Sequence, residues 1–237
     1  MTVRAQRAVE QAEVLIWADS LVAPEIAALA PANCERLRSG NLTLEAVMEA
    51  MLDGIRRGKR VVRLHDGDPC LYGALQEQIA RLADADVAVE VIPGISAYQA
   101  TAALNAELTI PGLVHTIVLS RASGRTGTPE RESLERLAAL QASLCLYLSA
   151  RHVEEVQQVL LKHYPADTLV AVGYRVSWPD QQLELVPLSE LAAYSQAKGL
   201  ERTTLYVVST ALAASGQARS RLYSPDHDHL FRPKRGS

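Results

Sequence analysis

RLHDGDPCLYG (residues 63–73) and VIPGISAYQA (residues 91–100) are the stretches that decide the fold. In each of them, an apolar strand is predicted to run into a glycine-bearing loop and then into a helix. In a parallel α/β sheet, that order places backbone N–H groups at the carboxyl ends of the strands. Two such loops in one half of the chain therefore predict a cleft for a polar small molecule.

The bulk composition fits a globular protein with a core of its own. The 237 residues suit one large domain or two small ones, and 48% of them are hydrophobic. A net charge of −3 gives no whole-protein reason to bind nucleic acid or an anionic membrane. The sequence holds no run of about 18 apolar residues, and the segment after Met1 lacks the apolar core of a secretory signal. We therefore expect neither a nucleic-acid nor a membrane partner.

The cysteines and histidines do not form a metal or disulfide pattern. Cys34, Cys70 and Cys145 are odd in number, far apart and form no CxxC pair. The six histidines have no metal-ligand spacing, and His227 and His229 alternate with aspartates in a polar tail where nothing preorganises them. We expect no metal site, no disulfide framework and a cytoplasmic location.

Strands and helices alternate along the chain, which predicts an α/β fold with two subdomains. The first half holds predicted strands at 13–18, 34–40, 60–67 and 87–94, and helices at 3–12, from Thr43 onward, around 75–82 and at 96–105. The second half holds predicted strands at 114–124, 143–149, 168–176, 181–188 and 202–210, and helices at 129–140, 152–164 and 189–199. A dense break at 112–129 is the predicted linker. We expect subdomains at 1–113 and 114–210, and a polar tail at 211–237.

The loop after the 60–67 strand carries the clearest candidate side chain. Gly67 lets backbone approach a ligand closely, and Pro69 stiffens the exit of the loop. Asp68 would lie at the carboxyl end of the strand, where it could accept hydrogen bonds from ribose hydroxyls or from a ligand amine. The alternative is a turn whose aspartate caps the following helix, and spacing alone favours that alternative.

Two further loops leave similar alternatives open. Ser96 follows the tight turn Pro93-Gly94, and by itself it reads best as a cap of the next helix. Arg121 and Arg125 stand among small residues, where they could bind carboxylates through paired N–H groups. A solvated linker is the alternative for these two arginines.

Taken together, the motifs resemble those of the tetrapyrrole methyltransferases of corrin biosynthesis. They stand in the same order as in that family: HDGDPCLYG, VIPGISA, ELTIPG (107–112), LSRASGRT (119–126), VGYRVSWPD (172–180) and RTTLYVV (202–208). The SGRT and YRVSWPD segments point to the branch that acts on precorrin-4. Uroporphyrinogen methyltransferases share the GDP and PG loops but differ in those two segments. The resemblance runs from residue 2 to about residue 232.

The resemblance implies a fold and an activity. Members have two α/β subdomains with an active-site trough between them, and they are usually homodimers. They bind S-adenosylmethionine largely through loop backbone. The implied reaction is methyl transfer from the sulfonium to carbon 11 of precorrin-4, or of cobalt-precorrin-4, which gives precorrin-5. In-line positioning of carbon and methyl would be the protein's main task.

The resemblance also implies site residues, position by position. The cofactor would be bound by residues of the two loops and of strand ends in the second half: Asp66, Gly67, Asp68, Leu71, Ser96, Ala97, Tyr147, Leu148, Tyr174, Val176 and Thr204. Arg121 and Arg125 would face the acetate and propionate arms of the corrinoid. Asp68, and after it Tyr72 or His65, could assist proton loss.

The chain departs from the family pattern at its beginning. Family members normally start with a strand and a glycine-rich loop, and this chain aligns just after them. We expect a misassigned start or a cut, with a longer natural protein; a truly truncated and impaired product is the alternative. Loss of that central strand would leave two neighbouring strands without ladder partners.

Several other functions compete with this interpretation. Methylation at another position of the macrocycle is the nearest alternative, and a non-catalytic binder of corrinoid or S-adenosylmethionine is a second. A nicotinamide-dependent enzyme is disfavoured because no GxGxxG opens a helix with an acidic residue about 20 positions on. A nucleic-acid methyltransferase is disfavoured by the acidic balance of the chain.

Overall fold

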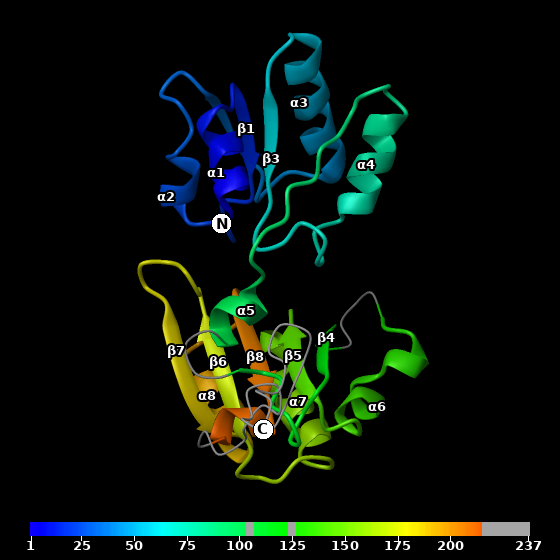
Figure 1. The fold of residues 1–237 in the computed structure, drawn as a ribbon, viewed down its shortest axis with the longest axis vertical. Coiled ribbons are helices and arrows are strands. Elements are labelled where there is room, and N and C mark those ends of the chain that lie inside the picture. Colours follow the sequence, from blue (N-terminus) through cyan, green and yellow to red (C-terminus); the bar gives the residue numbers. More distant parts are fainter. Residues whose placement is uncertain (103–106, 123–126, 215–237) are drawn as a thin grey trace, which may run out of the picture. The chain divides into compact units, whose positions relative to one another are not determined.

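The computed structural model describes residues 1–102, 107–122 and 127–214. The chain divides into two compact units, Met1–Gln99 and Ala100–Ser237. Each unit combines helices with a sheet of its own (Figure 1). The predicted α/β class is therefore confirmed, while the predicted boundaries after residues 113 and 210 stay predictions.

The first unit is a parallel sheet with helices on both faces. Strand β1 (Val14–Trp17) lies between β2 (Glu35–Arg38) and β3 (Val61–Leu64), and both pairings are parallel. The helices of this unit are α1 (Val3–Glu10), α2 (Pro24–Ala27), α3 (Leu44–Arg56) and α4 (Leu75–Ala83). These elements match the predicted order of strands and helices from residue 3 to residue 83.

The side chains of β1 alternate between two cores. Leu15 packs in the cluster that contains Val9 of α1, whereas Ile16 packs in the cluster that contains Met48 of α3 and Leu82 of α4. Every residue of β1 is buried, as expected for a parallel strand covered on both faces. The carboxyl ends of β1 and β3 thus lie at one edge of a well-packed sheet.

The predicted strand at 87–94 is wrong, because that segment forms no strand. Among the described residues, β3 pairs with β1 alone. The segment is held instead by the Thr2 hydroxyl, which donates to the Pro93 carbonyl at 3.2 Å, and by an ion pair between Arg4 and Glu90. Its valines fit a strand locally, but a strand also needs a neighbour that pairs with its backbone.

The second unit is built on a mixed five-stranded sheet. Its strands are β4 (Ile117–Arg121), β5 (Ser143–Tyr147), β6 (Leu169–Tyr174), β7 (Gln182–Pro187) and β8 (Thr204–Val208), in the order β4-β5-β8-β6-β7. In this sheet β4 and β5 pair in parallel. Strand β8 is antiparallel to its neighbours β5 and β6, and β7 is antiparallel to β6. The strands that were predicted in this half are confirmed.

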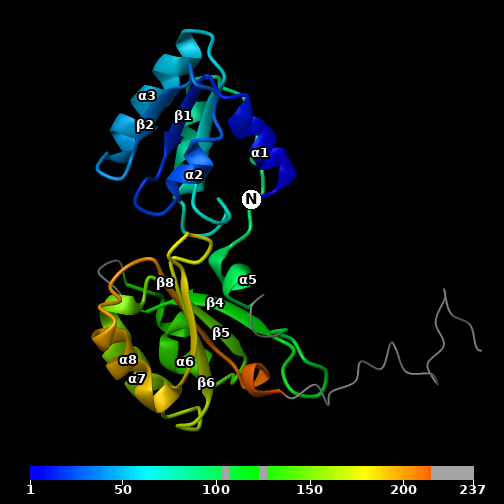
Figure 2. The ribbon, with the colours of Figure 1, turned by 90° about the vertical axis from the view of Figure 1, so that its left-hand side faces the viewer.

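Helices α6 (Leu134–Ala138), α7 (Val153–Leu160) and α8 (Leu191–Ala197) cover one face of that sheet (Figures 1 and 2). The core between them includes four fully buried side chains, Leu146 and Val170 of the sheet and Val156 and Leu191 of the helices. Helix α5 (Ala97–Ala102) spans the division between the two units. The predicted hairpin turn at WPD connects β6 to β7.

Two segments differ in detail from the prediction. The helix expected at 129–140 is split into a 3-10 turn, Glu130–Glu132, and α6, because Ser133 adopts extended backbone and caps α6. A short 3-10 helix, Thr210–Ala213, follows β8, and its Ala211 and Leu212 are buried.

No helix in the described part of the chain is long and apolar enough to cross a membrane.

Candidate functional site

In the first unit, the loop after β3 and the loop before α5 are clasped together by one carboxylate. Asp68 Oδ1 accepts from the Cys70 N–H at 2.8 Å, and Asp68 Oδ2 accepts from the Gly94 N–H at 3.0 Å. A Cβ at position 94 would stand 1.9 Å from the Gly67 carbonyl oxygen, and Gly67 has a φ of +59°. The two predicted glycine loops therefore meet, and glycine is required where they touch.

The charge of Asp68 is part of this clasp. Partial burial is the largest single influence on its carboxyl and opposes ionisation, but the N–H groups of Cys70 and Gly94 and the Cys70 thiol outweigh it and lower the pKa of Asp68. The ionised aspartate thus serves as an acceptor for the loops. The predicted catalytic role of Asp68 stays a prediction, as does that of Tyr72.

A second set of titratable groups directly follows β3. Burial, and then the positive charge of Arg63, lower the pKa of His65 to about 4. Burial raises the pKa of Asp66, against a backbone hydrogen bond and the attraction of Arg63. The Arg63 guanidinium donates from Nη1 to the carbonyls of Ile16 and Leu64, while its Nε is buried with no partner among the described residues. The loop therefore favours a neutral imidazole at His65. Next to it, the pKa of the Asp66 carboxyl is raised and that of the Asp68 carboxyl is lowered.

The remaining predicted residues of this unit lie in the same two loops. Leu71 is half-buried and donates its N–H to the Asp68 carbonyl, and Tyr72 is 48% exposed with a φ of +57°. Ser96 is buried, and its N–H donates to the Gln99 side chain at the start of α5. The structure thus brings the predicted loop residues of the first unit together: Asp66, Gly67, Asp68, Leu71, Tyr72, Ser96 and Ala97.

In the second unit, strand register aligns the predicted residues along one end of the sheet. Arg121, at the end of β4, is the register partner of Tyr147, at the end of β5. Tyr174, at the end of β6, is the partner of Thr204, at the start of β8. Because β8 is antiparallel to β5 and β6, its first residue lies at the same edge as their last residues. The four residues therefore form a row across four neighbouring strands.

Backbone strain is concentrated at that same edge. Leu148, Arg175, Ser177 and Thr203 all have φ values between +47° and +71°, although none is a glycine. Such a conformation costs on the order of 1–3 kcal/mol per residue and is found preferentially at functional sites. Leu148, which was predicted to contact the cofactor, is also 68% exposed. Strain and an exposed apolar side chain both mark this end of the sheet as the candidate site of the second unit.

Hydrogen bonds fix the strand ends in this row. The Ser149 hydroxyl donates to the Tyr147 carbonyl at 2.7 Å and accepts from the Ala122 N–H at 2.8 Å. On the other side, the Arg175 N–H donates to the Thr203 carbonyl at 2.9 Å. Sequence reasoning missed Ser149 and Thr203, because neither strained backbone at a non-glycine residue nor cross-strand hydroxyl bonding leaves a signal in the sequence.

Helix α5 packs directly on the end of β6. A Cβ at Gly173 would stand 2.5 Å from Thr101 Oγ1 and 2.8 Å from a methyl group of Val176. Thr101 is fully buried, and its hydroxyl has no hydrogen-bond partner within the described ranges. Gly173 is therefore the position that lets the helix and the predicted cofactor residue Val176 approach the strand.

Of the two predicted substrate arginines, Arg121 belongs to the described residues and Arg125 does not. Arg121 donates from Nη2 to the Gly127 carbonyl at 2.9 Å. Arg125 lies outside the described residues.

No group of three or more histidine, cysteine, aspartate or glutamate side chains that could hold a metal ion occurs among the residues that the structure describes.

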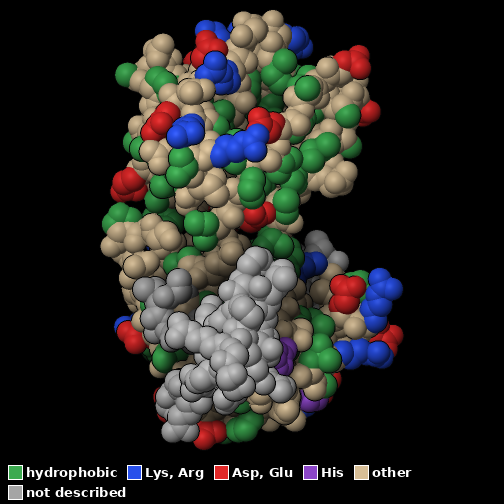
Figure 3. All heavy atoms as spheres, in the orientation of Figure 1, with side chains coloured by type: hydrophobic (Ala, Val, Ile, Leu, Met, Phe, Trp, Pro, Cys, Tyr) green, Lys and Arg blue, Asp and Glu red, His purple; other side chains and the backbone are tan. Residues whose placement is uncertain are grey.

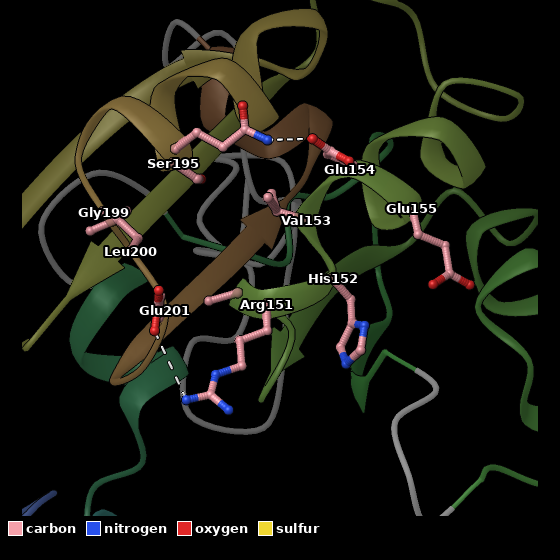
Figure 4. A pocket seen from close by; sticks show the side chains of 11 residues that line it. Arg151, His152, Val153, Glu154, Glu155, Ser195, Gly199, Leu200 and Glu201 are labelled. Atoms are coloured by element: carbon pink, nitrogen blue, oxygen red, sulfur yellow. Dashed lines mark hydrogen bonds and ion pairs between the residues drawn. The ribbon is translucent and has the colours of Figure 1, made fainter.

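A cavity of about 610 Å³ opens where α7 begins and α8 ends (Figure 4). Arg151 points toward Glu201, with which it forms an ion pair at 3.9 Å, and Gln196 donates to Glu154. Its lining comprises Ala150–Glu155, Ser195, Gln196 and Gly199–Glu201. None of the predicted site residues lines this cavity. Its lining residues Ala150 and Glu201 each lie two positions along the chain from a strained residue, Leu148 and Thr203.

Charges are mixed over the described surface that Figure 3 shows, where acidic and basic side chains are interspersed over each unit. Each unit thus carries a candidate site of its own. In the first unit it is the pair of clasped loops, and in the second unit it is the row of strand ends.

Comparison with known proteins identifies the family. The model of the "Tetrapyrrole (Corrin/Porphyrin) Methylases" family matches residues 1–192. The chain is 36% identical to the cobalt-precorrin-4 C(11)-methyltransferase of Methanocaldococcus jannaschii, over 98% of this chain and 90% of that protein. It is 40% identical to the precorrin-4 C(11)-methyltransferase of Pseudomonas aeruginosa, over 98% and 93% of the two chains.

A solved structure agrees with these relatives. The X-ray structure of a cobalamin biosynthetic enzyme, cobalt precorrin-4 methyltransferase, superposes with a TM-score of 0.85 at 36% identity and covers 90% of each chain. The similarity in sequence and in fold thus extends over nearly the whole length of these relatives. The chain belongs to the tetrapyrrole (corrin/porphyrin) methylases.

Proposed function

We propose that this protein is an S-adenosylmethionine-dependent C-methyltransferase that methylates carbon 11 of precorrin-4 or of cobalt-precorrin-4 and so acts in cobalamin biosynthesis. The observation that carries the proposal is the near full-length similarity to relatives of that activity, at 36% and 40% identity. The motifs that distinguish this branch in the sequence, SGRT and YRVSWPD, agree with it.

The residues of the two loops fit the methyl donor chemically. S-adenosylmethionine is a cation with a ribose diol and an ammonium group, and it supplies an activated methyl group when bound. Asp66 contributes a carboxyl group beside the clasp, and Tyr72 is a half-exposed phenol in the same loop. Carboxylates attract cationic groups and accept from ribose hydroxyls, so the donor set suits such a ligand.

The second unit offers groups suited to the other parts of the reaction. The exposed apolar surface of Leu148 suits a flat base such as adenine. The guanidinium of Arg121, at the end of the same row, suits a carboxylate arm of the corrinoid. We infer that this row takes part in binding the donor and the acceptor.

The proposed chemistry balances without a further reactant. The ring carbon of the enamine-like conjugated macrocycle attacks the methyl carbon, the new C–C bond forms as the C–S bond breaks, and the electron pair returns to sulfur. The macrocycle then loses one proton where conjugation requires it. The protein's task is positioning, because the sulfonium is already activated. Asp68 or Tyr72 is proposed to assist the proton loss.

Three further properties are proposed from the family resemblance. They are a homodimer, a cytoplasmic location, and the absence of a nucleic-acid partner. Subdomain boundaries after residues 113 and 210, with the active-site trough between the subdomains, belong to the same proposal. Methylation at another position of the macrocycle, or binding without turnover, is the competing function.

The proposed function is tested by incubation of the purified protein with labelled S-adenosylmethionine and either precorrin-4 or cobalt-precorrin-4. We expect a product that is one methyl group heavier, with equimolar S-adenosylhomocysteine. Transfer to uroporphyrinogen III, but to neither precorrin-4 form, would overturn the proposal in favour of another methylase of the family.

A further inference from the structure

We propose that Arg175 is a specificity-determining residue that binds a carboxylate arm of the corrinoid substrate, with Trp178 and Asp180 holding its guanidinium in place. The inference rests on the proposed function, since it names a residue through which that substrate is recognised.

The turn after β6 adopts strained backbone at Arg175. Its φ is +47°, a conformation that glycine or asparagine adopts at lower cost. The turn is held by the Arg175 N–H, which donates to the Thr203 carbonyl at 2.9 Å, and by the Trp178 N–H, which donates to the Arg175 carbonyl at 2.9 Å. A turn that served only to connect two strands would favour one of those smaller residues, so the arginine side chain itself calls for a role.

The guanidinium is held in one orientation by two contacts. Its carbon lies 4.0 Å from the centroid of the Trp178 ring, and its Nη1 lies 2.7 Å from Asp180 Oδ2. Within the described part of the chain, Asp180 is the one acidic partner of this guanidinium. A guanidinium carries five N–H donors, so a fork of donors remains for a planar acceptor such as a carboxylate. The side chain is 30% exposed, which leaves that fork accessible.

The ion pair with Asp180 does not by itself explain the arginine. Asp180 has 56% of its side chain exposed, and pairs with an exposed partner contribute at most about 1 kcal/mol to stability. What the pair and the stacked ring do supply is preorganisation, which lowers the entropic cost of binding a ligand. Trp178 and Asp180 are therefore positioning residues for Arg175.

The position of Arg175 matches a wide, acidic ligand. It follows Tyr174, the last residue of β6, whereas Arg121 ends β4 at the same edge of the sheet. The strand order places three interstrand spacings between these two ends, which is roughly 14 Å. A tetrapyrrole with acid arms on its rim has a comparable width, so two arginines at strand ends with this separation suit arms on opposite sides of the ring.

A carboxylate could also come from the methionine part of the donor, and the experiment separates the two sources. Arg175→Met and Arg175→Lys are compared with wild type and with Arg136→Met. Arg136 is a matched control, because it is an exposed arginine of the same unit that also forms an ion pair, here with Glu130 at 3.4 Å. Thermal unfolding of all four proteins reports any structural loss.

Binding is measured without turnover, so that the test does not depend on the reaction. The probes are cobyrinic acid, a stable corrinoid with free acid arms, its heptamethyl ester, and S-adenosylhomocysteine. We expect Arg175→Met to bind cobyrinic acid about tenfold more weakly or worse, with Arg175→Lys intermediate. Its affinity for the ester and for S-adenosylhomocysteine should match that of wild type, and Arg136→Met should match wild type throughout.

Three other binding results overturn the inference. A loss of S-adenosylhomocysteine affinity in Arg175→Met, with corrinoid binding intact, would assign the carboxylate to the donor. Unchanged binding of all three probes, or a loss equal for the acid and its ester, would leave Arg175 as a loop-closing residue only. Failure of wild type to methylate precorrin-4 while this pattern holds would overturn the proposed function and spare the carboxylate site.

Discussion

Gly94 and Gly67 are in such close contact that a Cβ at position 94 would stand 1.9 Å from the Gly67 carbonyl oxygen. The Asp68 carboxylate bridges the same two loops through the N–H groups of Cys70 and Gly94. The candidate site of the first unit is thus a single tied structure, in which the loop after β3 and the loop before α5 hold each other in place.

Gly94→Ala is expected to separate the two loops. A methyl group cannot be placed 1.9 Å from a backbone oxygen, so the backbone must shift, and we expect a loss of about 2 kcal/mol or more in the free energy of unfolding. S-adenosylhomocysteine affinity, measured by calorimetry, should fall at the same time. The matched control is Gly58→Ala, which adds a methyl group with nothing within 4 Å of its Cβ position. Its φ of +69° makes that variant report backbone strain without a steric contact. If both variants bind alike, the contact between the loops does not shape the site.

Asp68→Asn is expected to weaken the clasp, because an amide offers one acceptor oxygen where two N–H groups need one each. We expect a loss of about 1–3 kcal/mol in the free energy of unfolding, measured by urea titration at pH 7. The contrast is Asp66→Asn, which removes a carboxylate whose pKa is raised by burial and should therefore cost little or stabilise. Equal losses in the two variants would contradict a specific role for Asp68 in the clasp.

The same carboxylate predicts a pH dependence. The pKa of Asp68 is lowered in the folded state, so its contribution to stability is complete above the ordinary value of 3.8 and is lost as the pH falls below it. In Asp68→Asn this part of the acid dependence should be absent. Urea titrations of both proteins between pH 5 and pH 3 would reveal it, and parallel curves would contradict the assignment.

His65 predicts a second pH dependence in a higher window. The folded state lowers its pKa from 6.5 to about 4, so the unfolded state binds more protons between these two values. Stability should be complete above about pH 6.5 and should decline as the pH falls toward 4. His65→Asn should reduce the difference in unfolding free energy between pH 7 and pH 5. The control is His152→Asn, which changes an exposed histidine outside the loop; an equal effect in both variants would contradict the prediction.

Thr101 and Gly173 predict a coupled pair in the second unit. Gly173→Ala should destabilise the protein by about 1–3 kcal/mol, because the new methyl group would stand 2.5 Å from Thr101 Oγ1. Thr101→Val should be neutral or stabilising, since the hydroxyl that it removes is buried without a partner in the described structure.

A double-mutant cycle tests the contact between these two residues. Thr101→Ala removes both atoms of Thr101 that lie near the Gly173 Cβ position, so it should recover part of the loss caused by Gly173→Ala. Additive unfolding free energies would show that the two positions do not interact.

Local patterns were sufficient to predict most of the elements. The apolar run of β1 and the Thr43 cap of α3 are signals within a few residues, and the structure has both where they were expected. The segment 87–94 carries an equally good local signal, yet it forms no strand because strand formation depends on a neighbour far along the chain. The helix expected at 129–140 ends early for a local reason, since Ser133 caps a second helix instead of continuing the first.

The candidate site was predictable where glycine and proline mark its loops. Gly67 and Gly94 indicate loops with close contacts, but not that Asp68 would tie them, because that bond joins residues 26 positions apart. The row of Arg121, Tyr147, Thr204 and Tyr174 depends on β8 running antiparallel between β5 and β6, which no local pattern specifies. Strain at Leu148 and Arg175 is likewise invisible in the sequence, because neither residue is a glycine.

The most direct test of the central claim is the position of the new methyl group. The purified protein is incubated with precorrin-4, or its cobalt form, and S-adenosylmethionine that carries a ¹³C-labelled methyl group, and the product is examined by NMR. We predict a single labelled methyl group on carbon 11 of the macrocycle. A label on any other carbon, or bound S-adenosylmethionine with no transfer to either substrate, would contradict the proposed function.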